Sequence, residues 1–263
     1  MLSVAMIAMN EEGAVERVIS EIRAALGDRE HEIVIVDSSR DRTPEIAEAL
    51  GARVIRQFPP RGYGFAMNRV LNECRGEVIV TLDCDGTYPA SAIIPLADRV
   101  LTGECDIVNA SRLGGKPDSM PWPNYIGNWI FAATGTVLLG VKSTDVHSGM
   151  RAYRRSVIHG VPCDSNGPAL PVDLLLKPAL LGFRISEVFI PYGERIGNTT
   201  LQKWTSTLWT FRRMLRLVPL RFNKPALAPA ATEAASLSSL ARAVGESGAV
   251  VPEPAAHPVT RRY

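Results

Sequence analysis

The first half of the chain alternates short apolar runs with segments in which apolar residues recur every three or four positions. Apolar runs at residues 2–8, 32–36 and 77–82 have the length of buried strands. Between the first two runs, apolar residues follow helical spacing at Val15, Val18, Ile19, Ile22 and Leu26. Strands that alternate with amphipathic helices predict an α/β domain with a mainly parallel, Rossmann-like sheet flanked by helices.

Cap and turn residues divide this pattern into elements. Asn10 is expected to cap the first helix and Gly27 to end it, while Pro44 suits the first turn of a second helix. Further strands are predicted at 53–56, 106–110 and 185–191, and further helices at 63–75, 89–101, 125–139 and 172–181. Residues 145–151 are expected to form a polar turn. One domain over residues 1–202 accounts for all of these elements.

The pattern changes after residue 202. Apolar residues recur at helical spacing at Trp204, Leu208, Phe211, Leu215 and Val218, and no acidic residue occurs between Glu194 and Glu233. A basic amphipathic helix is therefore predicted over residues 203–222. Such a helix either lies on a membrane surface or packs its apolar face on the domain, and both readings stay open. Residues 225–263 are dominated by alanine, proline and serine, so we expect a disordered tail.

Composition narrows the class of protein. With 263 residues, 46% hydrophobic and 21% charged, the chain is typical of a soluble globular protein. A net charge of +2 is too small to indicate nucleic-acid binding, and none is expected. The N-terminal run lacks a basic region and a cleavage site, and the longest apolar stretch is interrupted by polar residues. We therefore expect a cytoplasmic protein, with peripheral membrane contact through residues 203–222 as the alternative above.

Carboxylates follow two of the predicted strands. Asp37 ends the second strand, and Asp83 and Asp85 follow the strand at 77–82. Ligands of such sheets bind at the carboxyl ends of the strands, and paired carboxylates suit Mg²⁺ or Mn²⁺ together with phosphate oxygens. A solvated turn is the alternative for the Asp83 pair. Asp37 is predicted to recognise a nucleobase or ribose, with a turn cap as the alternative.

Seven short motifs, taken together, resemble family 2 glycosyltransferases, and most closely the branch that glycosylates dolichyl or polyprenyl phosphate. The motifs are Ala8-Met9-Asn10-Glu11-Glu12, Val36-Asp37 with Asp41 and Thr43, Gly62-Tyr63-Gly64, Leu82-Asp83-Cys84-Asp85-Gly86, Ala110-Ser111-Arg112, Ser148-Gly149-Met150-Arg151 and Arg195-Ile196-Gly197. Each motif is weak alone, but their order and spacing from about residue 2 to 203 are specific.

The resemblance implies a GT-A fold, a UDP- or GDP-sugar donor, a divalent metal and inversion at the anomeric carbon. It also implies roles for individual residues. The residues that would line the nucleoside pocket are Ala8, Asn10, Glu11 and Asp37. Asp83 would contact the ribose and the metal ion, and Asp85 would bind the metal ion directly. Arg112 and Arg195 would bind the phosphate groups.

Asp173 matches an acidic position of the family just inside a helix. If the acceptor is a hydroxyl group, Asp173 would be the general base. If the acceptor is a lipid phosphate, no base is needed and Asp173 would only orient a substrate. An acidic residue that interacts with the helix dipole is the structural alternative.

Two other functions are weighed against glycosyl transfer. A sugar-phosphate nucleotidyltransferase would need a glycine- and basic-rich segment after the first strand, where this chain has Asn10-Glu11-Glu12. A non-catalytic nucleotide- or membrane-binding protein on the same fold is the second alternative. His147 is interpreted as structural.

Overall fold

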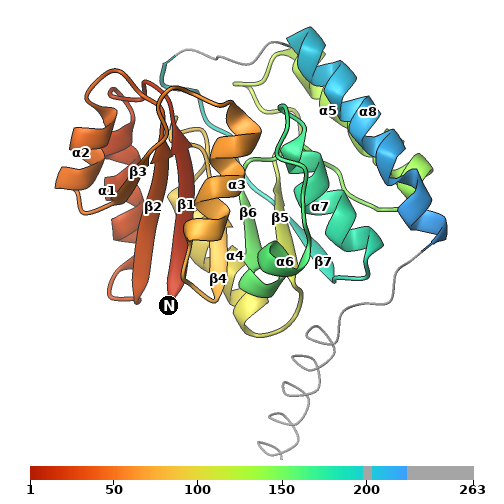
Figure 1. The fold of residues 1–263 in the computed structure, drawn as a ribbon, viewed down its shortest axis with the longest axis horizontal. Coiled ribbons are helices and arrows are strands. Elements are labelled where there is room, and N and C mark those ends of the chain that lie inside the picture. The colour runs from red at the N-terminus through yellow and green to blue at the C-terminus, as the bar shows by residue number, and fades with distance from the viewer. Residues whose placement is uncertain (198–202, 224–263) are drawn as a thin grey trace, which may run out of the picture. The chain divides into compact units, whose positions relative to one another are not determined.

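The computed structural model describes residues 1–197 and 203–223, and of residues 203–205 only the backbone. Within it, seven strands form a single sheet in the order β3-β2-β1-β4-β6-β5-β7 (Figure 1). The strands are β1 (Leu2–Ala8), β2 (His31–Asp37), β3 (Arg53–Arg56), β4 (Val78–Thr81), β5 (Ile107–Ser111), β6 (Arg151–Arg154) and β7 (Ile185–Phe189). All pairings are parallel except those of β6 with β4 and β5. The predicted mainly parallel sheet is confirmed.

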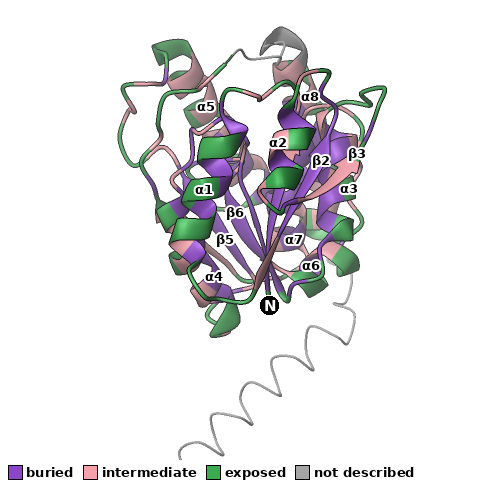
Figure 2. Cartoon of the chain, turned by 90° about the vertical axis from the view of Figure 1, so that its left-hand side faces the viewer, coloured by how far each residue is buried: buried purple, intermediate pink, exposed green. Residues whose placement is uncertain are grey.

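Helices cover both faces of the sheet, so the central strands are buried, whereas the edge strands β3 and β7 are only partly buried (Figure 2). One face carries α1 (Val15–Leu26), α2 (Thr43–Ala49), the short 3₁₀ helix η1 (Ala90–Ala92) and α4 (Ile93–Leu101). The other carries α3 (Tyr63–Glu73), α6 (Arg155–Gly160) and α7 (Leu170–Leu180), with α5 (Trp122–Leu139) and α8 (Lys203–Phe222) packed beside α7. Neighbouring residues of β1, β2 and β4 belong to opposite cores, which explains why these strands are apolar along most of their length.

The loop after β1 differs from the prediction. Asn10 does not cap α1, because α1 begins only at Val15 and has Ala14 as its N-cap residue. Asn10 instead adopts a left-handed conformation with φ of 62°, and its Oδ1 accepts a hydrogen bond from the backbone N–H of Arg40 at 2.9 Å. Its side chain therefore joins the loop after β1 to the loop after β2, a contact that helix-cap spacing does not reveal.

The strand β6 and the helix α6 were not predicted. The β6 sequence Arg-Ala-Tyr-Arg has no apolar run, yet its first three residues are buried between β4 and β5. Because β6 runs antiparallel, it brings the turn at 145–151 to the edge of the sheet where β1, β2 and β4 end. This edge carries the candidate site.

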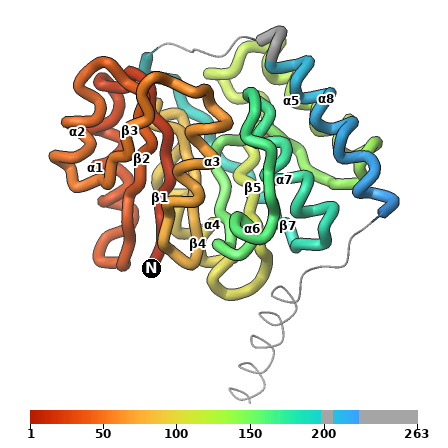
Figure 3. The backbone as a smooth tube through the Cα atoms, viewed as in Figure 1, coloured from red at the N-terminus to blue at the C-terminus, as the bar shows by residue number. Residues whose placement is uncertain are grey.

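The helix predicted at 203–222 is present as α8 and lies alongside α5 (Figure 3). Met214 and Leu217 are buried against the domain, and the ring of Phe211 lies 5.2 Å from that of Phe131. Leu208 and Leu215, which belong to the predicted apolar face, are 70% and 60% exposed. The helix thus packs through a neighbouring stripe and leaves part of its apolar face uncovered.

In the described part of the chain, no helix is long and apolar enough to span a membrane. The predicted tail at 225–263 lies outside the described residues.

Candidate active site

Asp83 and Asp85 lie in the turn that follows β4. Asp85 is buried, and its Oδ1 accepts hydrogen bonds from the backbone N–H of Thr87 at 3.0 Å and from its hydroxyl at 2.6 Å. The other oxygen, Oδ2, lies 2.6 Å from Nη2 of Arg195. The carboxylate is therefore hydrogen-bonded to Thr87 through Oδ1, while Oδ2 forms an ion pair with Arg195 and accepts no hydrogen bond from the described residues.

The segment that carries Arg195 is fixed to the same turn by its backbone. The N–H of Ile196 donates to the carbonyl of Asp85 at 3.0 Å, and the N–H of Gly193 donates to the carbonyl of Thr87 at 2.9 Å. The sequence predicted Asp85 and Arg195 for one site although they lie far apart in the chain, and the structure brings them together.

Glu11 completes a cluster of carboxylates with Asp83 and Asp85. Burial, the charges of Asp85 and Asp83, and the weaker charge of Asp41 raise the pKa of Glu11 to about 7, although Arg195 opposes the shift. Burial and the charge of Asp85 raise the pKa of Asp83 to about 6, against the opposing effect of Arg195 and Arg112. Burial is the largest cause of both shifts, and the negative charges of neighbouring carboxylates add to it, so this site is a buried place with several carboxylates close together.

The chemistry of this cluster fits a divalent cation. A cation would offset the crowded charge, and carboxylate oxygens are the ligands that Mg²⁺ and Mn²⁺ prefer. The described residues contain no group of three or more His, Cys, Asp or Glu side chains arranged to enclose a metal ion. A site with one or two protein carboxylates suits a cation that keeps water and takes phosphate oxygens from a substrate.

The turn at 145–151 places Gly149 against the side chain of Asp83, where a larger residue would be too close. A Cβ atom at position 149 would lie 3.0 Å from both carboxylate oxygens of Asp83, which is too close for an ordinary contact. The N–H of Gly149 also donates to the Tyr88 hydroxyl at 2.7 Å. The backbone of this turn therefore forms one wall against Asp83.

The loops after β1 and β2 are joined by hydrogen bonds. The backbone N–H groups of Asn10 and Glu11 donate to the hydroxyls of Ser39 and Thr43 at 2.8 and 2.9 Å. The N–H of Glu12 donates to Asp41 at 3.2 Å. Ala8 is paired with Asp37 in the sheet register, so the residues assigned to a nucleoside pocket share one edge.

Asp37 is fully buried, and both of its oxygens already have partners. Oδ1 accepts from the Ser39 hydroxyl at 2.6 Å, and Oδ2 accepts from the Ser39 N–H at 3.1 Å and from the Arg56 guanidinium. These bonds shape the loop after β2. Contact of Asp37 with a nucleoside stays a prediction.

Arg112 lies beside the site in a bidentate ion pair that the sequence did not predict. Its Nε and Nη2 donate to the carboxylate of Asp145 at 2.6 and 2.9 Å, and its guanidinium carbon lies 5.2 Å from the ring centre of Tyr192. Burial works against the charge of Asp145, but Arg112 outweighs it and lowers the pKa of Asp145. A phosphate contact by Arg112 stays a prediction.

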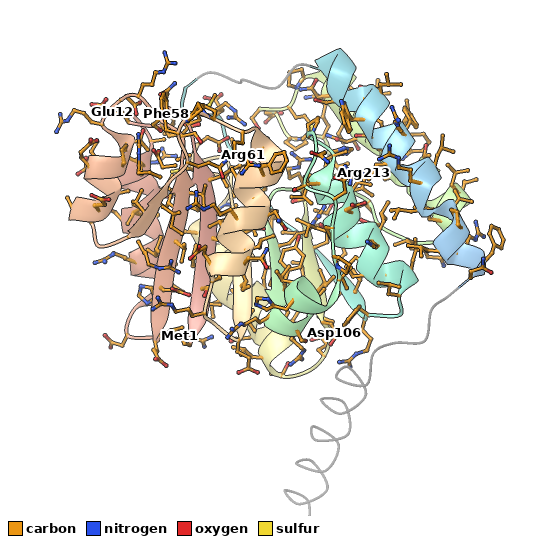
Figure 4. All side chains as sticks on the ribbon, in the orientation of Figure 1. Met1, Glu12, Phe58, Arg61, Asp106 and Arg213 are labelled. Atoms are coloured by element: carbon orange, nitrogen blue, oxygen red, sulfur yellow. The ribbon has the colours of Figure 1, made fainter. Side chains whose placement is uncertain are left out.

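Asp173 lies in the first turn of α7 and is paired with a residue of α8. Its Oδ2 accepts from Nη1 of Arg213 at 2.7 Å and from the backbone N–H of Asp164 at 3.2 Å. Arg213 is itself buried. Figure 4 shows that it lies between α7 and α8. The opposite oxygen, Oδ1, is buried and has no hydrogen-bond partner among the described residues.

Arg151, to which the sequence prediction gave no role, connects two segments beside the site. It is buried, and it donates to Asn109 at 2.7 Å, to the carbonyl of Val146 at 2.9 Å and to the carbonyl of Pro171 at 2.5 Å. It therefore ties the turn at 145–151 to the start of α7, where Asp173 lies. No local signal in the sequence marks this position, because the burial of Arg151 becomes apparent only once β6 is placed between β4 and β5.

Comparisons with known proteins identify the family of this chain. The sequence model of the family described as Glycosyl transferase family 2 matches residues 3–161. A dolichyl-phosphate hexose transferase of Haloferax volcanii is 42% identical over 76% of this chain and 86% of the relative. An undecaprenyl-phosphate mannosyltransferase of Micrococcus luteus is 29% identical over 62% of this chain and 72% of the relative.

A solved structure has the same fold. Glucosyl-3-phosphoglycerate synthase of Mycobacterium tuberculosis, in complex with Mn²⁺, UDP-glucose and phosphoglyceric acid, superposes with a TM-score of 0.63 and 26% identity. The match covers 86% of this chain and 80% of that chain. The fold is therefore the GT-A fold of glycosyltransferases, as the sequence predicted. This chain belongs to glycosyl transferase family 2, in the branch of the dolichyl- and polyprenyl-phosphate hexosyltransferases, and it is a glycosyltransferase.

Proposed function

We propose that this glycosyltransferase moves one sugar, with inversion, from a UDP- or GDP-sugar to the phosphate of a polyprenyl phosphate. The observation that carries the proposal is the cluster of Glu11, Asp83 and Asp85 with Arg195 at the carboxyl edge of the sheet. The names of two relatives, a dolichyl-phosphate hexose transferase and an undecaprenyl-phosphate mannosyltransferase, support the acceptor class.

In this reaction an acceptor phosphate oxygen forms a bond to the anomeric carbon. The bond from that carbon to the β-phosphate oxygen of the donor breaks, and the nucleoside diphosphate leaves with the electron pair. Asp83 and Asp85 would hold Mg²⁺ or Mn²⁺, which when bound would neutralise charge on the departing diphosphate. The Mn²⁺ and UDP-glucose in the mycobacterial structure support this assignment.

The remaining residues of the edge would bind the donor. Ala8, Asn10 and Glu11 lie on the loop after β1, and Asp37 pairs with Ala8, so this side would receive the nucleoside. Arg195 and Arg112 would bind phosphate oxygens, for which a permanently charged planar guanidinium is well suited.

A phosphate acceptor is already anionic and does not need a base to remove a proton. Asp173 would then orient a substrate. This role agrees with the hydrogen bonds that Arg213 and the N–H of Asp164 donate to Oδ2 of Asp173. General-base catalysis by Asp173 would be required only for a hydroxyl acceptor.

The exposed faces of α5 and α8 support contact with a membrane that contains the acceptor. On α5, the exposed apolar residues follow one helical stripe and include Trp122 and Trp129, which are 62% and 63% exposed. Leu208 and Leu215 are exposed on the adjacent α8, together with Arg212 and Arg216. Aromatic and aliphatic side chains beside arginines are typical of a helix that lies in the interface of an anionic bilayer.

The direct test is transfer of labelled sugar from UDP-glucose or GDP-mannose to undecaprenyl phosphate in vesicles, with Mn²⁺ or Mg²⁺. We expect a lipid-linked product with one of the donors and loss of activity with a chelator. Synthesis of a nucleotide-sugar from a nucleoside triphosphate and a sugar phosphate, without any transfer, would instead identify a nucleotidyltransferase.

A further inference from the structure

Arg213 stands out among the residues outside the carboxylate cluster, because it is buried, charged and contributed by the last described helix. Its guanidinium donates to Asp173 at 2.7 Å, to the carbonyl of Asp164 at 2.9 Å and to the carbonyl of Asn166 at 2.8 Å. It also lies 3.3 Å from the Asp164 carboxylate. One side chain of α8 thus holds both Asp173 and the turn before α7.

This turn leads towards the carboxylate cluster. A Cβ atom on Gly64, in the first turn of α3, would lie 2.1 Å from the carbonyl oxygen of Ser165, so the turn packs closely on α3. Tyr63 precedes Gly64 in the chain. Burial is the largest cause that raises the pKa of the Tyr63 hydroxyl, and the charge of Asp83 is the second. The start of α7 is also tied to the site by Arg151, which donates to the carbonyls of Pro171 and Val146 and so holds the turn whose Gly149 lies against Asp83. Arg213 therefore fixes a turn that connects α8 with the neighbourhood of Asp83.

The unpaired oxygen of Asp173 points to a ligand. Oδ1 is buried, has no hydrogen-bond partner among the described residues, and belongs to a side chain that is 4% exposed. Leaving a buried carboxylate oxygen without a partner is costly, so an exception of this kind calls for an explanation such as a catalytic role. A residue needed only for folding would gain from pairing both oxygens.

We propose that Arg213 is a positioning residue for Asp173, and that the free Oδ1 of Asp173 accepts a hydrogen bond from a hydroxyl group of a bound substrate. This inference rests on the proposed function. The hydroxyl group belongs either to the donor sugar or to the acceptor, whose singly ionised phosphate carries one. Arg213 holds Oδ2 and thereby orients Oδ1.

The test compares Arg213→Met, Arg213→Lys, Asp173→Asn and the Arg213→Met/Asp173→Asn double variant. Arg154→Met is the matched control, because Arg154 forms a partly buried pair with Asp106 at 3.3 Å and lies on β6 at the opposite edge of the sheet. Transfer to farnesyl phosphate, hydrolysis of the donor without acceptor, and binding of UDP with Mn²⁺ are measured for each.

Each single variant Arg213→Met and Asp173→Asn is expected to lower kcat/KM on the order of tenfold, the usual effect of losing one hydrogen bond to a charged group. Arg213→Lys should recover part of the loss, since it keeps the charge but not the planar fork. The double variant should lose little more than either single variant, because both changes remove the same interaction. Binding of UDP with Mn²⁺ should stay as in the wild type.

The two sources of the hydroxyl group give different patterns. A donor-sugar hydroxyl predicts weaker binding of the UDP- or GDP-sugar and slower donor hydrolysis. An acceptor hydroxyl predicts a higher KM for farnesyl phosphate with donor hydrolysis unchanged. Wild-type kinetics in Arg213→Met, or losses that multiply in the double variant, would overturn the proposal.

Hydrogen exchange separates this proposal from the proposed function. Exchange of amides at residues 163–173 should become faster in Arg213→Met than in Arg154→Met, whether or not sugar transfer is found. Failure of the wild type to transfer sugar to any phosphate acceptor would refute the proposed function. Unchanged exchange at 163–173 in Arg213→Met would refute the positioning role.

Discussion

Arg195 lies 2.6 Å from Asp85, so a guanidinium already occupies one side of the carboxylate to which we assign a metal. The positive charges of Arg195 and Arg112 lower the pKa of Asp83, against burial and the charge of Asp85, which raise it. A cation and Arg195 would therefore compete for Asp85, and donor phosphates would give Arg195 another partner.

The variant Arg195→Met is expected to bind Mn²⁺ alone more tightly than the wild type, because a competing positive charge is removed. It should bind UDP with Mn²⁺ less tightly, since a phosphate contact is lost. Both affinities can be measured by isothermal titration calorimetry, with Arg29→Met, an arginine paired with the half-exposed Asp98, as the control. Weaker binding of Mn²⁺ alone would contradict this role.

His147 should make the folded state sensitive to mild acid. Burial, helped by the charges of Arg112 and Arg151 and opposed by Asp145, lowers its pKa to about 4, and its Nε2 lies 2.8 Å from the Thr210 hydroxyl on α8. The unfolded chain then binds more protons than the folded chain between about pH 4 and 6.5. The stability that the uncharged His147 contributes to the folded state is fully present above the pKa of histidine in the unfolded chain, and it is lost as pH falls through this window.

We expect the free energy of unfolding in urea to fall by on the order of 2 kcal/mol between pH 7 and pH 5 from His147 alone. His147→Gln should remove this part of the slope, whereas the exposed His159→Gln should leave it in place. An unchanged slope in His147→Gln would show that the ring is not buried as described.

The ion pair between Arg112 and Asp145 should matter strongly for stability when only one partner is removed. The side chain of Asp145 is fully buried and that of Arg112 is only 10% exposed, so Asp145→Ala leaves a largely buried guanidinium without its partner. We expect a loss of about 3–5 kcal/mol in the free energy of unfolding, with part of it recovered in Arg112→Met/Asp145→Ala. Asp98→Ala removes a half-exposed partner and should cost about 1 kcal/mol or less. Equal losses in the two alanine variants would contradict the burial of the Arg112 pair.

Membrane contact through α5 and α8 can be tested with apolar residues that face outwards. Trp129→Glu/Leu215→Glu should reduce co-sedimentation with anionic vesicles, because charge is placed where apolar side chains would enter the bilayer interface. Leu101→Glu changes an exposed apolar residue at the end of α4 and serves as the control. Vesicle binding that is equal in all three proteins, or absent from the wild type, would remove the membrane assignment.

The sequence predicted most of the fold because strand and helix periodicities are local properties of the chain. The apolar run at Leu2–Ala8 and the helical stripe that includes Val15 and Leu26 became β1 and α1. The strand β6 was missed because Arg151–Arg154 is polar in sequence and becomes buried only through its neighbours β4 and β5. The burial of β6 depends on contacts between strands that are distant in sequence, and the spacing of apolar residues along one segment does not predict such contacts.

The candidate site also combines residues that the sequence could predict with partners that it could not. Asp83 and Asp85 were found because they follow an apolar strand, and Arg195 because it belongs to an ordered set of motifs. The partners of Arg112 and Asp173 were not found: Asp145 lies 33 positions from Arg112, and Arg213 lies 40 positions from Asp173. No spacing rule links residues so far apart in a single sequence. The sequence also left open which face of α8 packs on the domain, because the contacts of α8 with α5 and α7 select it.

The most direct test of the central claim is the activity of Asp85→Asn. Asparagine keeps the shape of the side chain and an oxygen that can accept from Thr87, but it lacks the charge that a divalent cation needs. We predict that sugar transfer falls by about 100-fold or more and that Mn²⁺-dependent binding of UDP is lost together with it, while Asp98→Asn behaves as the wild type. Unchanged sugar transfer by a folded Asp85→Asn protein would contradict the assignment of the active site.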